Sequence, residues 1–246
     1  MSDRRVFDSP EALARAAGEF AFDRLARAVQ ARGHALLALA GGSTPRATYT
    51  WMARHAMPGF DWTRVHFFWS DERWVAAGSP DSNYGMARQT LLEGIPVPAD
   101  HVHAIPTVGR DPAEAARTYE STLREFLGGE PAGFDLAFLG LGPDGHTASL
   151  FPGDPALGER DRWVVSVPRS PRPPECPRVT ATIPLLNRSR TVLFLVEGPE
   201  KADILARVAA ASRKPDPPYP ASRVRGRDAT WWYVDRAAAG EARRVP

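Results

Sequence analysis

One stretch decides the fold: Phe134-Asp135-Leu136-Ala137-Phe138-Leu139-Gly140-Leu141, followed directly by Gly142-Pro143-Asp144-Gly145-His146. The first part is apolar almost throughout, which is typical of a strand in a parallel sheet with both faces covered. The second part is a glycine-rich turn that lets the backbone approach a ligand closely, and it presents a carboxylate and an imidazole. The stretch therefore predicts a buried parallel strand with polar chemistry at its carboxyl end.

Strand and helix patterns alternate along the rest of the chain. Helices are predicted over residues 8–32, from about 43 to 55, and over 82–92, 112–127 and 199–211. Strands are predicted at residues 34–40, 65–69, 101–105, 134–141, 163–167, 179–183, 191–196 and 230–234. This alternation predicts a three-layer α/β/α sandwich with a mainly parallel, Rossmann-like sheet.

The chain shows no internal repeat and no boundary between domains, so a single domain over residues 1–246 is expected. Residues 212–220 contain four prolines and are expected to form a flexible or extended connection. In a sheet of this kind, ligands bind beyond the carboxyl ends of the strands, near a reversal of strand order. Residues that immediately follow strands are therefore the first candidates for a functional site.

Composition excludes several classes of protein. The 31 basic and 29 acidic residues nearly cancel, so neither a nucleic acid nor a membrane surface is an expected partner. Cys176 is the only cysteine, which rules out an intrachain disulfide. The sequence contains neither a signal peptide nor an apolar run near the ~20 residues that span a bilayer. A cytoplasmic location is expected.

The first candidate site is the turn Gly41-Gly42-Ser43-Thr44-Pro45, which follows a strand and opens a helix. Its backbone N–H groups, its two hydroxyls and the helix N-terminus could converge on an anion such as phosphate. The alternative is a tight turn with a Ser or Thr cap. The turn matches neither a Walker loop nor GxGxxG, so a nucleotide is not indicated.

Further charged residues lie at strand or helix ends. Arg73 could grip a phosphate or carboxylate, and Asp71 could orient that group or carry a proton. Arg178 begins a predicted strand. Lys201 lies in the first turn of a helix, where a cation opposes the helix dipole unless it meets a bound anion. Each of these residues could instead be an ordinary solvated charge.

His146 is the main candidate for acid–base chemistry, because an unperturbed imidazole titrates at pH ~6.5. Asp144 could fix its tautomer or stabilise the imidazolium, although a purely structural histidine is the alternative. His101 and His103 share one face of a predicted strand but lack a third ligand, so no metal site is expected. Ser149 lies in no nucleophile elbow, so covalent catalysis is not expected.

Motifs along nearly the whole chain resemble the 6-phosphogluconolactonases of the glucosamine-6-phosphate isomerase/deaminase-like superfamily, which have the NagB-like fold. The resemblance rests on six blocks in the family order: Leu39-Ala40-Gly41-Gly42-Ser43-Thr44-Pro45; Ser70-Asp71-Glu72-Arg73-Trp74-Val75 with Ser82-Asn83-Tyr84; Gly140 to Pro152; Arg178-Val179-Thr180-Ala181-Thr182-Ile183-Pro184; Gly198-Pro199-Glu200-Lys201; and Pro220-Ala221-Ser222 leading to residues 232–238.

The resemblance implies hydrolysis of 6-phospho-D-glucono-1,5-lactone to 6-phosphogluconate in the oxidative pentose phosphate pathway, without a metal or organic cofactor. His146 would activate the attacking water and return the proton to the ring oxygen, and Asp144 would orient His146. Loop N–H groups or Arg73 are candidates for stabilising the oxyanion. The only partner implied is a small sugar-phosphate substrate, and the chain would be a monomer or weak homodimer.

The same resemblance places the substrate phosphate among residues 41–44, Arg178 and Lys201, with Asp71 and Arg73 also facing the substrate.

Two other functions compete with the lactonase. The sibling deaminases typically have tyrosine after Asp-Glu, where this chain has Arg73, and a glutamate in an Asn-Glu-Pro ending, where it has Leu150-Phe151-Pro152. A noncatalytic sugar-phosphate sensor would normally add a DNA-binding segment, for which no spare length is expected. Both comparisons favour the lactonase.

Overall fold

The computed structural model describes residues 3–55, 57–109, 111–128 and 133–241. Within these residues, six parallel strands form one sheet in the order β1-β9-β8-β5-β2-β3. The strands are β1 (Asp3–Phe7), β2 (Ala35–Leu39), β3 (Val65–Trp69), β5 (Leu136–Gly140), β8 (Thr191–Val196) and β9 (Ala229–Asp235). Every residue of β2 and β8 is buried, as in a sheet covered on both faces. The predicted parallel α/β architecture is confirmed.

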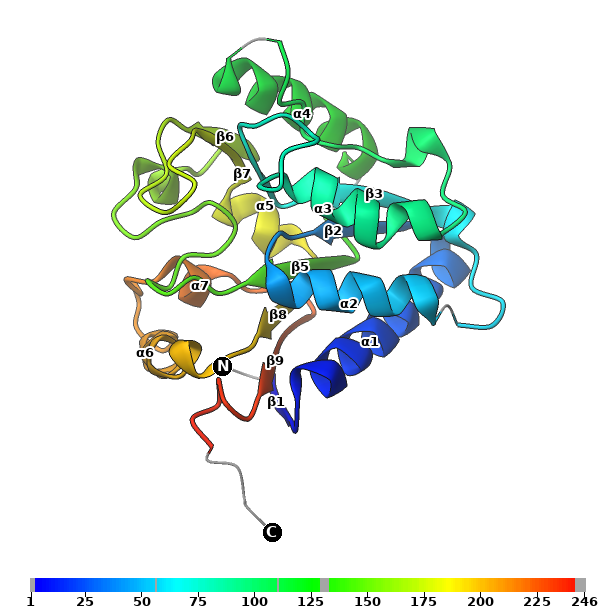
Figure 1. Ribbon diagram of the computed structural model, residues 1–246. Coiled ribbons are helices and arrows are strands. Elements are labelled where there is room, and N and C mark those ends of the chain that lie inside the picture. Colours follow the sequence, from blue (N-terminus) through cyan, green and yellow to red (C-terminus); the bar gives the residue numbers. More distant parts are fainter. Residues whose placement is uncertain (1–2, 56, 110, 129–132, 242–246) are drawn as a thin grey trace.

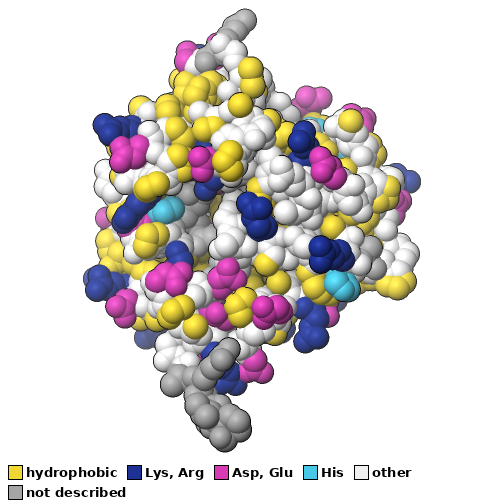
Figure 2. Space-filling view, in the orientation of Figure 1, with side chains coloured by type: hydrophobic (Ala, Val, Ile, Leu, Met, Phe, Trp, Pro, Cys, Tyr) yellow, Lys and Arg dark blue, Asp and Glu magenta, His cyan; other side chains and the backbone are white. Residues whose placement is uncertain are grey.

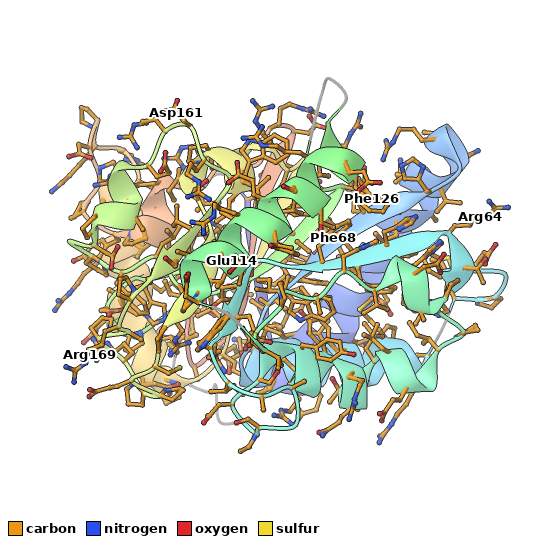
Figure 3. The ribbon with its side chains drawn as sticks, turned by 90° about the horizontal axis from the view of Figure 1, so that it is seen from above. Arg64, Phe68, Glu114, Phe126, Asp161 and Arg169 are labelled. Carbon is orange, nitrogen blue, oxygen red and sulfur yellow. The ribbon has the colours of Figure 1, made fainter. Side chains whose placement is uncertain are left out.

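Helices cover both faces of this sheet. They are α1 (Pro10–Arg32), α2 (Ser43–Arg54), α3 (Asn83–Thr90), α4 (Pro112–Leu127), α5 (Ile183–Arg188), α6 (Ala202–Ala211) and α7 (Pro220–Arg223). Helices α1 and α2 lie side by side (Figure 1), and Phe22 of α1 contacts Trp62, which stacks on Phe67 of β3. The adjacent Phe68 contacts Phe126 of α4, with ring centroids 5.7 Å apart (Figure 3). Neighbouring strand residues point to opposite faces, so α1 and α4 form two outer layers.

Local capping explains where the longest helix begins and ends. Ser9 Oγ accepts a hydrogen bond from Ala12 N at 3.2 Å, and Pro10 occupies the first helical position. Gly33 ends the helix with φ +81°, a conformation that strongly favours glycine. None of the described helices combines the length and hydrophobicity that a bilayer crossing requires.

A second, smaller sheet was not predicted. It is antiparallel, with the order β4-β7-β6, and consists of β4 (Asp71–Arg73), β7 (Arg178–Ala181) and β6 (Val164–Val167). The strands expected at residues 163–167 and 179–183 are therefore present but lie outside the parallel sheet. The second of them ends early because Thr182 caps helix α5, accepting a hydrogen bond from Leu185 N at 3.5 Å.

The strand expected at residues 101–105 is wrong. Residues Ala99–His101 form a 3₁₀ turn, and only Val102 makes a β-bridge, with Phe67. Pro98 and Pro106 flank the segment and cannot donate to a sheet ladder, so pairing is confined to this point. The prediction also missed β1, in which three of the five residues are charged, and β4, α5 and α7, which have three to six residues. Of the residues 212–220, the first eight form turns and bends, and Pro220 is already the first residue of α7.

Two buried tyrosines fix the ends of neighbouring strands. The Tyr49 hydroxyl accepts from Ala40 N at 2.8 Å and donates to Ala40 O at 3.1 Å. The Tyr119 hydroxyl does the same for Trp69, at 2.8 and 3.0 Å. Burial raises the pKa of both phenols well above the usual value. These contacts satisfy backbone groups at the points where β2 and β3 lead into the loops beyond the sheet.

We expect Tyr49→Phe to lower the free energy of unfolding by about 1–3 kcal/mol, because the substitution leaves buried Ala40 N–H and C=O groups unpaired. Urea denaturation measures this change. Tyr84→Phe is the control, since the Tyr84 hydroxyl makes no hydrogen bond to the described residues. Its effect should stay within about 0.5 kcal/mol. Equal losses in the two variants would contradict the role of the Tyr49 hydroxyl.

Candidate active site

A cavity of about 300 Å³ opens at the carboxyl ends of β2, β5 and β8. The chain proceeds from β2 outward to β3 on one side and from β5 outward to β8 and β9 on the other, so strand order reverses between β2 and β5. Ligands in doubly wound sheets bind at this point. The charged or titratable residues that line the cavity are Asp71, Arg73, His146, Glu197, Glu200 and Lys201.

The loop after β2 is built for close approach of an anion. Gly42 has φ +107°, which strongly favours glycine, and it precedes α2 without any side-chain cap. A Cβ at Gly41 would lie 1.8 Å from Asn83 Oδ1, so the loop packs tightly on α3. The alternative of a Ser or Thr cap is not observed. The first N–H groups of α2 therefore lack a side-chain acceptor, and an anion in the cavity can supply one.

The turn after β5 joins Asp144 to His146. Asp144 Oδ1 lies 2.5 Å from His146 Nδ1 and accepts a hydrogen bond from His146 N at 3.2 Å. Asp144 Oδ2 accepts a hydrogen bond from Arg172 Nε at 2.9 Å. Burial alone would raise the pKa of Asp144, but the hydrogen bonds from His146 and Arg172 outweigh it and hold the pKa well below its usual value.

This geometry selects one imidazole tautomer. An ionised Asp144 only accepts hydrogen bonds, so Nδ1 of His146 carries the proton that it shares with the carboxylate. The other ring nitrogen, Nε2, then has a free lone pair. Since His146 lines the cavity, the lone pair of Nε2 can accept a proton from a molecule bound there.

Backbone hydrogen bonds fix the turn that carries His146. Gly142 N donates to His146 O at 2.8 Å, and Gly145 N donates to Gly142 O at 3.0 Å. Thr147 Oγ1 donates to Gly140 O at 2.9 Å, and Ala221 N donates to Gly145 O at 3.1 Å. The Gly142 N–H is therefore occupied and is not a candidate for stabilising an oxyanion.

A buried network supports the cavity floor. Asp71 accepts hydrogen bonds from Ser149 Oγ at 2.6 Å and from Asn83 Nδ2 at 3.2 Å. These contacts join β4, the N-terminus of α3 and the segment after the His146 turn. Asp71 is therefore both a lining residue and a structural link.

Glu72 organises the segment beside this floor. Its carboxylate accepts hydrogen bonds from the backbone N–H groups of Arg73, Asn83 and Tyr84 at 2.7–2.8 Å. Burial raises the pKa of Glu72, and the hydrogen bonds oppose the shift. Arg73 itself donates from Nη1 to Asp81 O at 2.6 Å. Arg73 Nε and Asn83 Oδ1 are buried without a hydrogen-bond partner among the described residues, and both side chains line the cavity.

Arg178 does not line the cavity. Its side chain is buried, and its Nη2 donates to Ser170 Oγ at 3.3 Å, Arg172 O at 3.4 Å and Pro174 O at 3.0 Å. As the first residue of β7 it lies beside Arg73 of β4, but its guanidinium faces the loop that leads into β7. The geometry therefore gives no support to the expectation that Arg178 contacts the phosphate directly.

The remaining candidates lie together. They come from segments far apart in sequence. The candidates that line the cavity are residues 41–44, Asp71, Arg73, His146 and Lys201. Asp144 does not line the cavity, but its carboxylate contacts Nδ1 of His146. Sequence reasoning missed Arg172, which lies 28 residues from Asp144 in a proline-rich segment that gives no spacing signal. It also missed Ser149 as a partner of Asp71, because the two residues lie 78 positions apart in sequence and meet only in the fold.

Histidines outside the cavity form a separate cluster. His66 stacks on His101 with ring centroids 3.8 Å apart, and its Nδ1 lies 3.1 Å from His103 Nε2. The pKa of His66 is lowered to about 4, mainly because the ring is partly buried and also because His101 and His103 lie beside it. In the described ranges, no group of His, Cys, Asp or Glu side chains is arranged to hold a metal ion.

Comparisons with known proteins show the family to which the chain belongs. Residues 8–232 match the family described as glucosamine-6-phosphate isomerases/6-phosphogluconolactonase. The chain is 41% identical to a 6-phosphogluconolactonase of Synechocystis over 89% of this chain and 90% of that protein. It is 40% identical to the 6-phosphogluconolactonase of Mycobacterium tuberculosis over 98% of each chain. The crystal structure of 6-phosphogluconolactonase from Thermotoga maritima superposes with a TM-score of 0.83 and 33% identity, covering 95% of this chain and 99% of that one. The chain belongs to the glucosamine-6-phosphate isomerase/6-phosphogluconolactonase family.

We expect Gly142→Ala to displace the His146 ring, because the added Cβ would lie 2.0 Å from Nδ1. Loss of the downfield Nδ1 proton signal in NMR spectra would report the broken contact with Asp144. Gly158→Ala is the control, since a Cβ there would meet no atom within 4 Å. An unchanged His146 spectrum in Gly142→Ala would contradict the close packing described for this turn.

Proposed function

We propose that the protein hydrolyses 6-phospho-D-glucono-1,5-lactone to 6-phosphogluconate in the oxidative pentose phosphate pathway. One observation carries the proposal: the Asp144–His146 pair opens onto the same cavity as the uncapped N-terminus of α2 and Lys201. A phosphorylated lactone needs one acid–base group at its ester and one anchor for its phosphate. The names of the relatives support this substrate.

The proposed reaction uses His146 in two steps. Nε2 takes a proton from a water molecule as the water oxygen attacks C1 of the lactone, forming a tetrahedral intermediate. The bond between C1 and the ring oxygen then breaks, and the imidazolium returns the proton to that oxygen, which becomes the C5 hydroxyl. Asp144 holds Nδ1 and balances the positive charge of the imidazolium. The new carboxylic acid ionises in water.

The phosphate anchor consists of the α2 N-terminus at residues 41–44 together with Lys201, and Arg73 lines the same cavity. Asp71 and Asn83 line the cavity and, in this proposal, contact sugar oxygens of the substrate. Arg178 is left out of the direct anchor because its Nη2 binds the 170–174 segment. This assignment differs from the family-based expectation at that one residue.

A deaminase-type isomerisation fits the site less well. The Phe151 ring contacts the His146 ring, with centroids 4.8 Å apart, at the position where a deaminase would need a carboxylate to assist its histidine. A noncatalytic sensor would have no use for the Asp144–His146 pair. The lactonase is therefore the function that the cavity supports best.

We also propose that residues 1–246 act as one domain, as a monomer or weak homodimer, in the cytoplasm. The single cysteine fits a reducing compartment. Basic and acidic side chains are interspersed over the face shown in Figure 2, which does not favour a polyanionic partner. The proposed domain includes residues 1–2, 56, 110, 129–132 and 242–246, which lie outside the described residues.

We expect His146→Ala to lower kcat by about 100-fold or more, because general acid–base catalysis is lost. Proton release from freshly generated 6-phosphogluconolactone measures turnover, after subtraction of the spontaneous rate. Binding of 6-phosphogluconate should persist in the variant. Near-normal turnover by His146→Ala would remove His146 from its role. Ammonia release from glucosamine 6-phosphate by the wild type would instead support the deaminase.

We expect Lys201→Ala to raise KM by about tenfold or more while changing kcat less, because a charge-assisted hydrogen bond to the phosphate is lost. Lys214→Ala is a matched control, since Lys214 is the only other lysine and does not line the cavity. Its steady-state constants should match the wild type. An unchanged KM in Lys201→Ala would refute the phosphate anchor at this residue.

A further inference from the structure

A loop of the small sheet contacts the catalytic pair from outside the parallel sheet. Residues 168–177 connect β6 to β7, and Arg172 in this loop donates from Nε to Asp144 Oδ2 at 2.9 Å. Asp144 belongs to the turn after β5. Each carboxylate oxygen therefore has its own cationic or proton-donating partner, His146 on Oδ1 and Arg172 on Oδ2.

The loop holds the backbone of Arg172 in place. Ser170 is fully buried, and its hydroxyl accepts from Arg172 N at 3.1 Å and donates to Arg172 O at 2.7 Å. Ser170 N donates to Cys176 O at 3.2 Å, which closes the loop. Arg178 Nη2 donates to Ser170 Oγ, Arg172 O and Pro174 O. The buried Arg178 thus supports the loop that delivers Arg172 to Asp144.

An ordinary surface ion pair would not be built in this way. The Asp144 side chain is only 20% exposed and the His146 side chain 21%, although Arg172 is 44% exposed. Exposed pairs contribute little because water screens them, whereas a partly buried carboxylate responds to each neighbouring charge. Two buried side chains, those of Ser170 and Arg178, also hydrogen-bond to the backbone of Arg172 and hold it in place.

We infer that Arg172 is a positioning residue for the proposed lactonase reaction: it fixes the Asp144 carboxylate and sets the pH at which His146 becomes a base. The inference rests on the proposed function. Asp144 carries one negative charge, and Arg172 already balances part of it. The protonated imidazole of His146 is therefore stabilised less by Asp144 than it would be in an isolated Asp–His pair.

Because Asp144 contacts both Arg172 and His146, the loss of Arg172 changes the pH dependence of catalysis in one direction. Without the Arg172 guanidinium, the negative charge of Asp144 interacts with the imidazolium of His146 alone. The protonated form of His146 is then more stable than in the wild type. The acid limb of kcat/KM must then move to higher pH, since catalysis needs the neutral imidazole. Other groups facing the pair stay unchanged in such a variant: Tyr219 and Phe151 against the turn, and Asp71, Arg73, Glu197, Glu200 and Lys201 around the cavity.

The test compares Arg172→Ala, Arg172→Gln and Arg172→Lys with the wild type between about pH 5 and 8. We expect the acid-limb midpoint of kcat/KM to rise by about half a unit or more in the first two variants, with kcat several-fold lower and KM for the phosphorylated lactone near normal. Arg172→Lys should return the midpoint towards the wild-type value.

Arg169→Ala is the matched control. Arg169 belongs to the same loop, points outward from the molecule (Figure 3) and pairs with the exposed Glu175 at 2.6 Å. It should leave the midpoint in place. An equal shift in Arg169→Ala would show a general effect of loop charge and would overturn the inference. A fall in kcat with an unmoved midpoint in Arg172→Ala and Arg172→Gln would reduce Arg172 to a structural residue, which also overturns it.

NMR titration of the His146 ring separates this inference from the proposed function. If the wild type fails to hydrolyse the lactone, the proposed function fails, but the titration midpoint of His146 still reports the influence of Arg172. An upward shift in Arg172→Gln supports the sharing of Asp144, and an unmoved midpoint refutes it. Arg172→Gln also provides a readout if Arg172→Ala does not fold.

Discussion

The parallel pairing of β2 with β5 is the constraint on which the rest of the site depends. Leu37 pairs with Leu136 and Ala38 with Ala137, so both strands end at the same edge of the sheet. The loop after β2 offers uncapped helix N–H groups, and the turn after β5 offers an imidazole held by a carboxylate. Neither half could perform hydrolysis of a phosphorylated ester alone. Their spacing is set by backbone hydrogen bonds between strands, which are far stiffer than contacts between surface loops.

Charge acts in this molecule through placement and not through quantity. The chain has a formal balance of +2, and several of its arginines pair with nearby carboxylates at the surface, such as Arg27 with Asp23, Arg169 with Glu175 and Arg236 with Asp8. Three cations differ from the rest by what they contact. Lys201 and Arg73 line the cavity, and Arg172 contacts Asp144 beside it. A single small dianion needs only this local arrangement, so net charge carries no information about the substrate.

Most of the parallel sheet and much of the site follow from the sequence because their signals are local. Apolar strands, the caps of α1 and the glycine-rich turns each lie within a few consecutive residues. The small antiparallel sheet could not be predicted, since β4 and β7 join residues more than a hundred positions apart. The family resemblance placed Arg178 at the phosphate, whereas the direction of its side chain depends on contacts with the 170–174 segment that the sequence does not reveal. Arg172 gave no signal for the same reason: its partner is defined only by the fold.

The loop that carries Arg172 also contains the only thiol in the protein. Cys176 is partly exposed, and its carbonyl closes the loop by accepting a hydrogen bond from Ser170 N. A fluorophore or spin label attached through sulfur chemistry would therefore report on this loop alone, with no engineered cysteine and no competing attachment point. The native Cys176 thus provides a labelling position four residues from Arg172, whose Nε donates to Asp144.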